Sequence, residues 1–383
     1  MEPWRYIADD GVSASYGLAA DEWLMSGYHA AHKPPPTLRL YTYAPECVLV
    51  GRFQNVEAEV SMEECRWRGI AVNRRPTGGG TIMMGPGQLG VAVVSSLAPA
   101  GAPGGASSGG PSGPREAIRT WSRGIVAGLE GLGIRATLRG KNDLEVGGRK
   151  IAGLGVYIDE NGAALFHCSL LAGMNLQLML SLLNIPLEKL SDRAVSALES
   201  RLTTVSRELD RSVDTDLLRG RIREGFARAF GVSLSPRPFT EGEVRGISRL
   251  ESEKYLASEW VYQRQPPRDT EGSARRKTGA GLLSVHLSLA GSVIKNLVIS
   301  GDFFSSMAAL NRLEARLRWS EAERGVVEDA VRTELSGGCG ILGLPAAEVS
   351  DVIMEAVADA GAQGVCFLRP RPPRPAEGQA TGR

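Results

Sequence analysis

Residues 74–80 read RRPTGGG, and further along the chain residues 140–153 read GKNDLEVGGRKIAG. Glycine has no Cβ, so a glycine run lets backbone N–H groups approach and surround an anion. Lys150 follows a Gly-Gly turn of the kind that closes a hairpin, and its ammonium group is a compact positive charge. A fold that brings the two stretches together would form a site for an activated, phosphate-bearing small molecule.

Each half of this pair also has a purely structural interpretation. A Gly-Gly-Gly run is commonly a tight turn, and a lysine at the start of a strand can be solvated at a sheet edge. Gly153 and Gly155 favour a ligand site, because glycines inside a strand often mark the close approach of a ligand or another backbone. Asn142 and Asp143 either open the hairpin as an Asx-turn or hold a nucleotide and a metal-bound phosphate.

Residues 165–171 read LFHCSLL, an apolar strand that contains His167 and Cys168. The histidine is either a hydrogen-bonded core residue or a group that contacts substrate. Cys168 is a candidate nucleophile, but the sequence shows no partner that would activate a thiolate, which favours a structural role. The five cysteines form no CxxC pair, which indicates reduced core thiols.

The composition indicates a soluble protein of two or three domains. The chain has 383 residues, of which 43% are hydrophobic and 23% charged. A formal net charge of +1 argues against a broad nucleic-acid or membrane surface. No apolar stretch is long enough for a transmembrane helix, and the first residues lack a secretory pattern. We therefore expect a cytoplasmic protein without nucleic-acid or membrane partners.

Hydrophobic periodicity predicts a chain of mixed helices and strands. Helices are predicted over 14–30, 115–132, 176–190, 214–230, 242–260, 305–318 and 321–335. Strands are predicted over 38–43, 47–50, 81–84, 90–96, 142–146, 150–158, 165–171, 281–289 and 292–300. Residues 99–114, rich in Gly, Pro and Ser, cannot bury enough apolar surface to fold and are predicted to be a flexible loop.

The order of these elements predicts a large N-terminal domain and a smaller C-terminal one. The first domain is expected over 1–232, followed by a linker over 233–243 that contains two prolines. A separate small α+β domain is expected over 244–368. Residues 369–383, rich in Pro and Arg, are predicted to be a disordered tail.

The motifs of residues 1–230, in their order along the chain, resemble those of lipoate–protein ligases. They are GRFQN at 51–55, RRPTGGG at 74–80, NDL at 142–144, GRKIAG at 148–153, FHCSLL at 166–171 and SRLTTV at 200–205. Residues 250–335 are similar to that family's C-terminal accessory domain. The resemblance implies an α+β (α/β) catalytic domain with mixed sheets flanked by helices, shared with biotin ligases and octanoyltransferases, plus a small α+β accessory domain.

The resemblance also implies an ATP-dependent reaction in two steps. Lipoate and Mg-ATP would form lipoyl-AMP and pyrophosphate, and a lysine of a lipoyl domain would then attack the adenylate and expel AMP. ATP is thus expected as a substrate and Mg²⁺ as its metal. The expected acceptors are lipoyl domains of 2-oxoacid dehydrogenases, the glycine-cleavage carrier protein or a related lipoate-binding carrier.

The same motifs suggest the site residues. Lys150 would be the catalytic residue, because a fixed ammonium near the acyl carbonyl stabilises the charge that develops in both steps. The residues expected to bind lipoyl-AMP are Arg75, Thr77, Gly78, Gly79, Gly80, Asn142, Asp143, Gly153 and His167. Asp143 would also be the metal ligand. The segments 82–84 and 154–156 are the expected walls of an apolar acyl tunnel.

One stretch departs from the ligase pattern. Ligases continue from the glycines to a His-Asp pair, whereas residues 84–89 read MGPGQL and resemble the HGPGQL of octanoyltransferases. The alternative is therefore an octanoyl- or lipoyl-transferase that uses a carrier-bound acyl donor. That class works through a cysteine in places where this chain has none, which, with the accessory domain, favours the ligase. A further alternative is a non-catalytic homologue that binds lipoate or a lipoyl domain.

Overall fold

The computed structural model describes residues 3–28, 34–97, 111, 113–184, 196, 199–335 and 340–366. They belong to two compact units. The first comprises Met1–Gln265 with Gly301–Phe304, and the second comprises Pro266–Ser300 with Ser305–Arg383. Apart from residues 111, 113 and 114, the predicted loop over 99–114 lies outside the described residues, and so does the predicted tail over 369–383.

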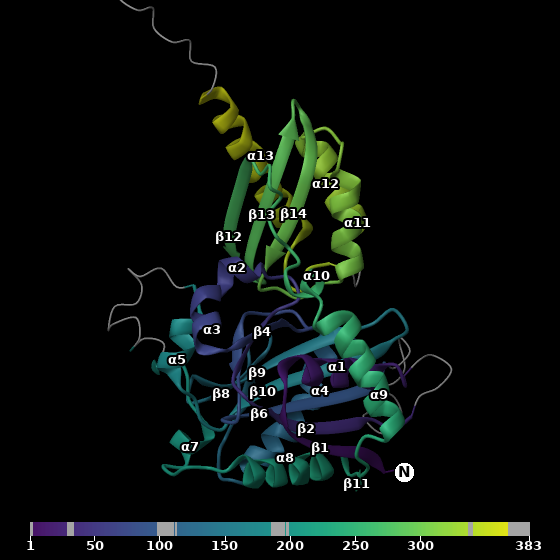
Figure 1. The fold of residues 1–383 in the computed structure, drawn as a ribbon. Helices are drawn as coiled ribbons and strands as arrows, with labels where there is room; N and C mark the ends of the chain where they lie inside the picture. Colours follow the sequence, from purple (N-terminus) through teal and green to yellow (C-terminus); the bar gives the residue numbers. More distant parts are fainter. Residues whose placement is uncertain are drawn as a thin grey trace, which may run out of the picture. The chain divides into compact units, whose positions relative to one another are not determined.

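Two mixed sheets form the first unit (Figure 1). The main sheet has eight strands in the order β11-β1-β2-β6-β10-β9-β8-β7, and the small sheet has the order β4-β3-β5. The bounds of the main strands are β1 (Trp4–Val12), β2 (Thr37–Tyr43), β6 (Gln88–Ser96), β7 (Thr137–Arg139), β8 (Asp143–Val146), β9 (Arg149–Ile158), β10 (Ala163–Leu171) and β11 (Leu234–Pro236). Those of the small sheet are β3 (Cys47–Val50), β4 (Ala71–Arg74) and β5 (Ile82–Met84). Strand β1 is parallel to β2 and β11, and β2 is antiparallel to β6.

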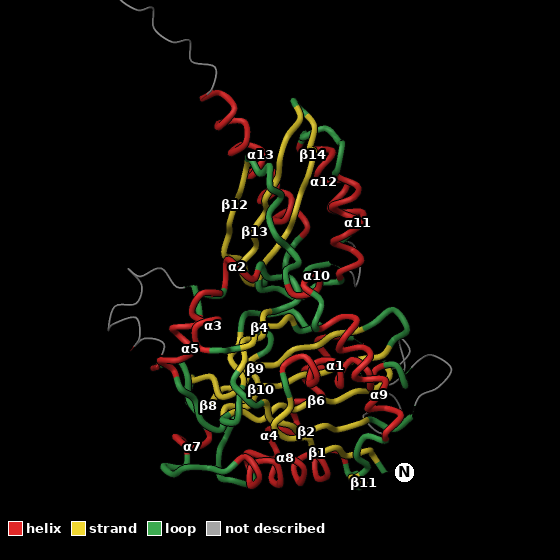
Figure 2. The backbone as a smooth tube through the Cα atoms, in the orientation of Figure 1, coloured by secondary structure: helices red, strands yellow, loops and turns green. Residues whose placement is uncertain are grey.

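Helices of the first unit flank these sheets (Figure 2). They are α1 (Ala14–Met25), α2 (Val56–Glu59), α3 (Met62–Arg68), α4 (Pro114–Glu130), α5 (Leu176–Leu182), α7 (Val205–Glu208), α8 (Thr215–Phe230), α9 (Glu241–Leu250) and α10 (Ser258–Val261), with a π-helical turn over Glu251–Tyr255. Helix α1 begins at a Ser13 cap, whose side chain accepts a hydrogen bond from the Tyr16 amide. The helices and mixed sheets together confirm the predicted α+β class.

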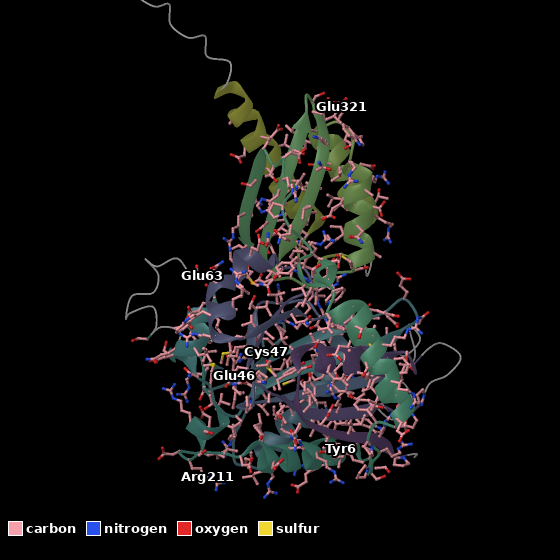
Figure 3. The ribbon with its side chains drawn as sticks, viewed as in Figure 1. Tyr6, Glu46, Cys47, Glu63, Arg211 and Glu321 are labelled. Carbon is pink, nitrogen blue, oxygen red and sulfur yellow. The ribbon has the colours of Figure 1, made fainter. Side chains whose placement is uncertain are left out.

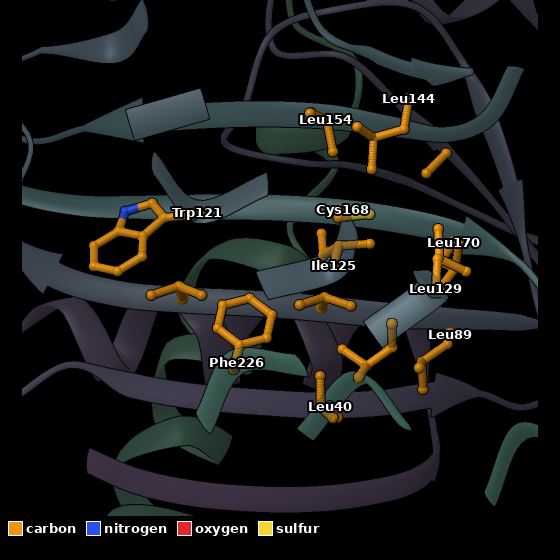
Figure 4. Packing of buried hydrophobic residues seen from close by; sticks show 14 of the residues in the cluster. Leu40, Leu89, Trp121, Ile125, Leu129, Leu144, Leu154, Cys168, Leu170 and Phe226 are labelled. Atoms are coloured by element: carbon orange, nitrogen blue, oxygen red, sulfur yellow. The ribbon is translucent and has the colours of Figure 1, made fainter. Parts of the chain in front are cut away.

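Helices α4 and α8 pack together on one face of the main sheet. The buried side of α4 carries Ile118, Trp121, Ile125 and Leu129 at helical spacing. The two helices approach closely because glycines lie at their crossing; a Cβ at Gly124 would lie 2.6 Å from the Phe226 ring. Figure 4 shows part of this cluster, with the α4 side chains against those of the strands.

The opposite face of the main sheet is covered by α1 and the small sheet. A second apolar cluster fills this layer, with Leu18 and Leu24 of α1 against Val48 and Leu49 of β3. Helix α1 lies close to β2, since a Cβ at Gly17 would come within 2.5 Å of the Tyr43 ring. The glycine run and the Lys150 hairpin both border this layer, which is where the fold forms a cavity.

The first unit extends beyond the boundary predicted from the sequence. The predicted linker over 233–243 contains β11, which pairs with β1, and helices α9 and α10 belong to the first unit although 244–368 was the expected accessory domain. Polar contacts explain the difference. Arg5 Nη1 lies 2.5 Å from Glu243 Oε1, and Lys254 Nζ lies 2.6 Å from Glu22 Oε1. These partners are distant in sequence, so periodicity alone does not show them.

The second unit is a small α+β structure. Its antiparallel sheet has the order β12-β13-β14, with bounds β12 (Gly272–Thr278), β13 (Gly281–Ala290) and β14 (Val293–Gly301). Its helices are α11 (Met307–Leu317), α12 (Arg324–Glu334) and α13 (Ala346–Cys366). Gly272 allows β12 to approach α13, because a Cβ there would lie 2.1 Å from the Ala356 carbonyl oxygen.

The predicted elements agree with the structure wherever the pattern was strongly periodic. The strands over 150–158 and 165–171 are β9 and β10, and the helix over 214–230 is α8. The helix predicted over 176–190 begins as expected with α5 but ends at Leu182, since Leu183 forms a β-bridge with Val60, and residues 185–190 lie outside the described residues. Strands β1 and β12 and helix α13 were not predicted. None of the described helices is long and apolar enough to cross a membrane.

Candidate functional site

A cavity of about 120 Å³ lies between the main sheet and the small sheet. It is lined from α1, β2, β3, β5, β9, β10 and the segment between β4 and β5. The sequence-predicted residues that line it are Arg75, Thr77, Gly79, Gly80, Asn142, Lys150, Gly153 and His167. Gly78 and Asp143 do not line it, but each contacts a residue that does. The fold therefore brings the two motif stretches to one place.

A β-bulge turns Lys150 toward this cavity. The register between β8 and β9 shifts between Leu144 and Glu145, and both Ile151 and Ala152 lie in the core on the α4 side. The extra residue places the Lys150 side chain on the same face as Gly153, as bulges commonly do near active sites. A Cβ at Gly153 would lie 3.3 Å from Lys150 Nζ. Glycine at this position leaves room for the lysine.

The Lys150 ammonium forms an ion pair that a substrate can replace. Its Nζ lies 2.6 Å from Asp143 Oδ1, and both side chains are 35% exposed. A pair of this exposure contributes at most about 1 kcal/mol, so exchanging the carboxylate for a substrate oxygen costs little. The lysine backbone is fixed, with its N–H donating to the Arg201 carbonyl at 2.8 Å and its carbonyl accepting from Thr203 N at 2.9 Å.

Arg75 shapes the glycine run. Its Nη2 donates to the carbonyls of Gly78 at 3.0 Å and Gly80 at 2.6 Å, and its Nη1 donates to the Leu49 carbonyl at 2.8 Å. Its Nε donates to Thr77 Oγ1 at 3.1 Å. Burial lowers the pKa of Arg75 to about 10, which leaves it charged at neutral pH. Because every guanidinium nitrogen binds the protein, Arg75 acts on the loop conformation.

Residues Gly301–Phe304 lie against the glycine run and belong to the same unit. The Gly79 N–H donates to the Phe303 carbonyl at 3.2 Å, and the Phe303 ring stacks on Phe53 at 5.0 Å. A Cβ at Gly78 would lie 2.3 Å from the Phe303 carbonyl oxygen. Gly79 has a φ of +91°, which favours glycine. These contacts require glycine at positions 78 and 79 independently of any ligand.

Asn142 and Asp143 lie at the mouth of the hairpin. Asn142 Nδ2 donates to the Leu154 carbonyl at 3.1 Å, and the Leu154 N–H donates back to the Asn142 carbonyl at 2.7 Å. The amide is thus held by β9. Within the described residues no three His, Cys, Asp or Glu side chains form a group that could hold a metal ion. Mg²⁺ at Asp143 stays a prediction, because this ion is often held by one or two carboxylates together with substrate phosphates.

His167 is held by a buried carboxylate that was not predicted from the sequence. Its Nε2 lies 2.7 Å from Oδ2 of Asp21, a fully buried residue of α1. Asp21 also accepts from Arg39 Nη1 at 2.7 Å and from the Tyr41 hydroxyl at 3.1 Å. Burial alone would raise the pKa of Asp21, but Arg39 and His167 hold it below its usual value. The sequence signal was an acidic residue on the apolar face of the helix, spaced with Leu18 and Leu24.

Cys168 borders the cavity, but its side chain belongs to the core on the other face of the sheet. Successive side chains of a strand point to opposite faces, so Cys168 lies on the side opposite His167. It packs in the α4 core, where Figure 4 shows it among apolar side chains. Burial raises the pKa of its thiol, which opposes thiolate formation. The free cysteines whose side chains the structure describes, Cys47, Cys65 and Cys168, are all buried.

The predicted apolar walls are partly formed. Ile82 and Met84 of β5 line the cavity, together with Leu154 and Gly155 of β9. Leu154 borders the cavity but packs its side chain in the α4 core together with Val156, because strand alternation leaves Gly155 on the cavity face. Further apolar wall comes from Leu18, Leu49, Tyr41 and Tyr43.

Met84 and Gly85, where the sequence departs from the ligase pattern, are both closely packed. Met84 is buried at the cavity, paired with Cys47. Gly85 lies against Glu46, since a Cβ there would come within 2.8 Å of Glu46 Cγ. Glu46 and Cys47, labelled in Figure 3, stand at the start of β3. No side chain larger than hydrogen fits at position 85 without moving Glu46.

Residues 13–227, more than half of the chain, match the family model of the lipoyl protein ligase A/B catalytic domain. The chain belongs to this family. The match includes every residue of the predicted site. The protein is therefore an enzyme of the lipoate ligase and octanoyltransferase superfamily, as the motifs at 74–80 and 148–153 suggested.

The curated relatives are named octanoyltransferases, whereas a matching solved structure is named a lipoate protein ligase. Both names belong to the same superfamily. Octanoyltransferase LipM of Brevibacillus brevis is 28% identical over 287 residues, which cover 69% of this chain and 100% of that protein. The structure of a bi-partite lipoate protein ligase from Thermoplasma acidophilum has a TM-score of 0.59 at 25% identity, covering 70% of this chain and 99% of that chain. LipL1 of P. falciparum, in complex with lipoate, shares the fold, with a TM-score of 0.71 at 14% identity, covering 91% of this chain and 99% of that chain.

The prediction of an ATP-dependent lipoate–protein ligase is wrong by these comparisons. The curated relatives are named octanoyltransferases, which supports the alternative reading and agrees with the MGPGQL run at 84–89. The physical reason lies in the site itself. A fixed ammonium stabilises negative charge on an acyl oxygen whatever the leaving group, so Lys150 and the glycines do not distinguish an adenylate from a thioester.

Proposed function

We propose that the protein transfers an octanoyl or lipoyl group from a carrier-bound thioester donor to a lysine of a lipoyl domain. The observation that carries this proposal is the similarity to octanoyltransferase LipM over that protein's whole length. The cavity suits an acyl group, because its apolar wall ends at the Lys150 ammonium. The expected acceptors remain the lipoyl domains of 2-oxoacid dehydrogenases, the glycine-cleavage carrier protein and related carriers.

Lys150 would stabilise the acyl carbonyl during transfer. Attack on a thioester carbon places negative charge on the carbonyl oxygen, and an ammonium fixed nearby lowers the energy of that state. The bulge in β9 and the backbone contacts of Lys150 provide this fixed position. The acyl chain would lie along Ile82, Met84 and Leu18, whose side chains offer no polar groups.

Transfer would be direct rather than through an enzyme thioester. Among the cysteines whose side chains the structure describes, Cys168 borders the cavity with its thiol in the α4 core, and Cys47 and Cys65 are buried outside the cavity lining. The acceptor amine would therefore attack the donor carbonyl while both partners are bound. This order predicts that donor and acceptor must be present together, with no acyl-enzyme formed beforehand.

Binding of ATP and Mg²⁺ at the same cavity stays a prediction. Asp143 and the glycine run are the residues that would take part. Isothermal calorimetry with ATP, with and without Mg²⁺, would measure it directly, and Asp143→Asn would be the matched variant.

The test uses the full chain with an octanoylated acyl carrier protein and an isolated lipoyl domain. Mass spectrometry of the lipoyl domain should show the gain of one octanoyl group without ATP, and the donor carrier alone should not acylate the enzyme. An acyl-enzyme adduct would refute direct transfer. Binding of the lipoyl domain without any acylation would favour the non-catalytic alternative.

A further inference from the structure

As in known acyl-transfer sites, a buried carboxylate holds one ring nitrogen of a histidine, but here that nitrogen is Nε2 rather than Nδ1. Nε2 of His167 lies 2.7 Å from Asp21 Oδ2, and Asp21 is fully buried with two further donors, Arg39 and Tyr41. An ionised carboxylate only accepts hydrogen bonds, so His167 Nε2 must carry its hydrogen. In the neutral ring the lone pair is then on Nδ1.

The surroundings of the ring leave it accessible from the cavity. His167 lines the cavity and stands opposite Gly155 on β9 and Ala92 on β6. Neither neighbour has a side chain larger than a methyl group, so no bulky group covers the imidazole from the adjacent strands. Its side chain is 11% exposed, whereas that of Asp21 is 0% exposed. The accessible part of the pair is therefore the histidine.

Amide formation needs a proton acceptor at this place. The acceptor lysine has an ordinary pKa of about 10.4, so almost all of it is an ammonium ion at neutral pH and cannot attack. Lys150 does not take this proton, because its charged form is the one that stabilises the carbonyl oxygen and pairs with Asp143. His167 is the remaining base on the cavity wall.

We infer that His167, oriented by Asp21, accepts the proton of the attacking lysine in the transfer reaction. The inference rests on the proposed function. The lysine ammonium gives one proton to Nδ1, and its nitrogen forms the C–N bond with the thioester carbon. The C–S bond breaks, the second nitrogen proton leaves on the sulfur as a thiol, and His167 returns its proton to solvent. Asp21 stays ionised and is a positioning residue.

The charged and titratable groups around His167 come from several elements. They are Asp21 on α1, Arg39, Tyr41 and Tyr43 on β2, Lys150 on β9, and Arg75 after β4. Arg39 forms ion pairs with both Asp9, at 2.7 Å, and the buried Asp21. Asp21 therefore shares the charge of this arginine with a second carboxylate. A general base of this kind typically contributes 10²–10⁴-fold to the rate.

Comparing transfer to two nucleophiles, hydroxylamine and the lipoyl-domain lysine, distinguishes a base role of His167 from a structural one. Hydroxylamine is largely unprotonated at neutral pH and needs no base, whereas the lipoyl-domain lysine does. His167→Gln should lower octanoyl transfer to the lysine about 100-fold at pH 7, and transfer to hydroxylamine by far less. The defect with lysine should shrink as the pH is raised toward 10. Asp21→Asn should show the same selectivity, and His286→Gln, in the second unit, serves as the control.

Each outcome decides the matter. Equal loss with both nucleophiles, in a variant that keeps its melting temperature, would overturn the role as base, and so would undiminished transfer to lysine. If Asp21→Asn fails to fold because Arg39 loses its partner, His167→Gln still decides. Failure of the unsubstituted protein to acylate either nucleophile from the thioester would overturn the proposed function, and this inference with it.

Discussion

At the scale of single residues, the proposed acyl transfer depends on Lys150. Removing one donor of this kind from a transition state typically costs about 2.7–4 kcal/mol, or 10²–10³ in rate. Lys150→Ala should therefore lower kcat for acyl transfer by about 100-fold or more. The melting temperature should change little, because both side chains of the Lys150–Asp143 pair are 35% exposed. Transfer assays and thermal unfolding would measure both quantities.

A matched control for this variant is Lys295→Ala, which removes an exposed ion pair with Asp269 in the second unit. It should leave transfer unchanged. Comparable rates for Lys150→Ala and Lys295→Ala would refute the role assigned to Lys150.

Cys168 provides the opposite residue-scale prediction. Its thiol lies in the α4 core, so Cys168→Ala should leave the transfer rate unchanged and reduce the free energy of unfolding by about 1 kcal/mol. Urea denaturation and the transfer assay would be compared on the same preparation. Loss of transfer with an unchanged unfolding midpoint would restore a thioester on Cys168.

The cavity shows which neighbouring residues a sequence pattern can predict. The glycine run and Lys150 were expected together, and the cavity brings them together, because both signals are local. Asp21 was missed because it and His167 are 146 residues apart, and only the packing of α1 on the sheet brings them into contact. The leaving group was predicted wrongly, since no side chain of the site is specific to it.

At the scale of elements, the N-terminus of α9 is held to β1 by an ion pair that involves a residue of its capping box. Thr240 and Glu243 form a capping box, and Arg5 donates to both carboxylate oxygens of Glu243. The hydrogen bonds from Arg5 lower the pKa of Glu243 from 4.5 to about 2. A lowered carboxyl pKa stabilises the fold above pH 4.5, and this contribution is lost as the pH falls through about 2.

Glu243→Gln should accordingly lower the free energy of unfolding by about 1 kcal/mol at pH 7. Between pH 4.5 and 2 the stability of the variant should fall less steeply than that of the natural sequence. Denaturant unfolding across this range would measure the difference. If the free energy of unfolding depended on pH in the same way in both proteins, Glu243 would not be the group responsible for the loss of stability in acid.

The crossing of α4 and α8 gives a second element-scale test with a built-in control. A Cβ at Gly124 would lie 2.6 Å from the Phe226 ring, so Gly124→Ala should destabilise by about 1–3 kcal/mol. Gly220 lies on α8, and a Cβ there would have no atom within 4 Å. Gly220→Ala should instead stabilise by about 0.4–1 kcal/mol. Equal urea midpoints for both variants would contradict the packing described here.

At the scale of the whole molecule, the class of both units was predictable because their strands and helices are strongly periodic. The boundary was not, since α9 and α10 belong to the first unit through contacts such as Trp260 Nε1 to the Arg74 carbonyl at 2.8 Å. Residues Gly301–Phe304 likewise belong to the first unit, although they follow a strand that lies mainly in the second. The assignment of such a short segment to a unit depends on tertiary packing, which the local sequence pattern does not show.

The identity of the acyl donor distinguishes acyl transfer from ATP-dependent ligation. The full chain would be incubated with a lipoyl domain and either octanoyl-carrier thioester without ATP, or free octanoate or lipoate with ATP and Mg²⁺. Intact-mass measurement of the lipoyl domain would follow acylation in each case. Direct transfer requires acylation from the thioester donor without ATP and none from the free acids. Acylation from a free acid only when ATP is present, with no transfer from the thioester, would contradict it.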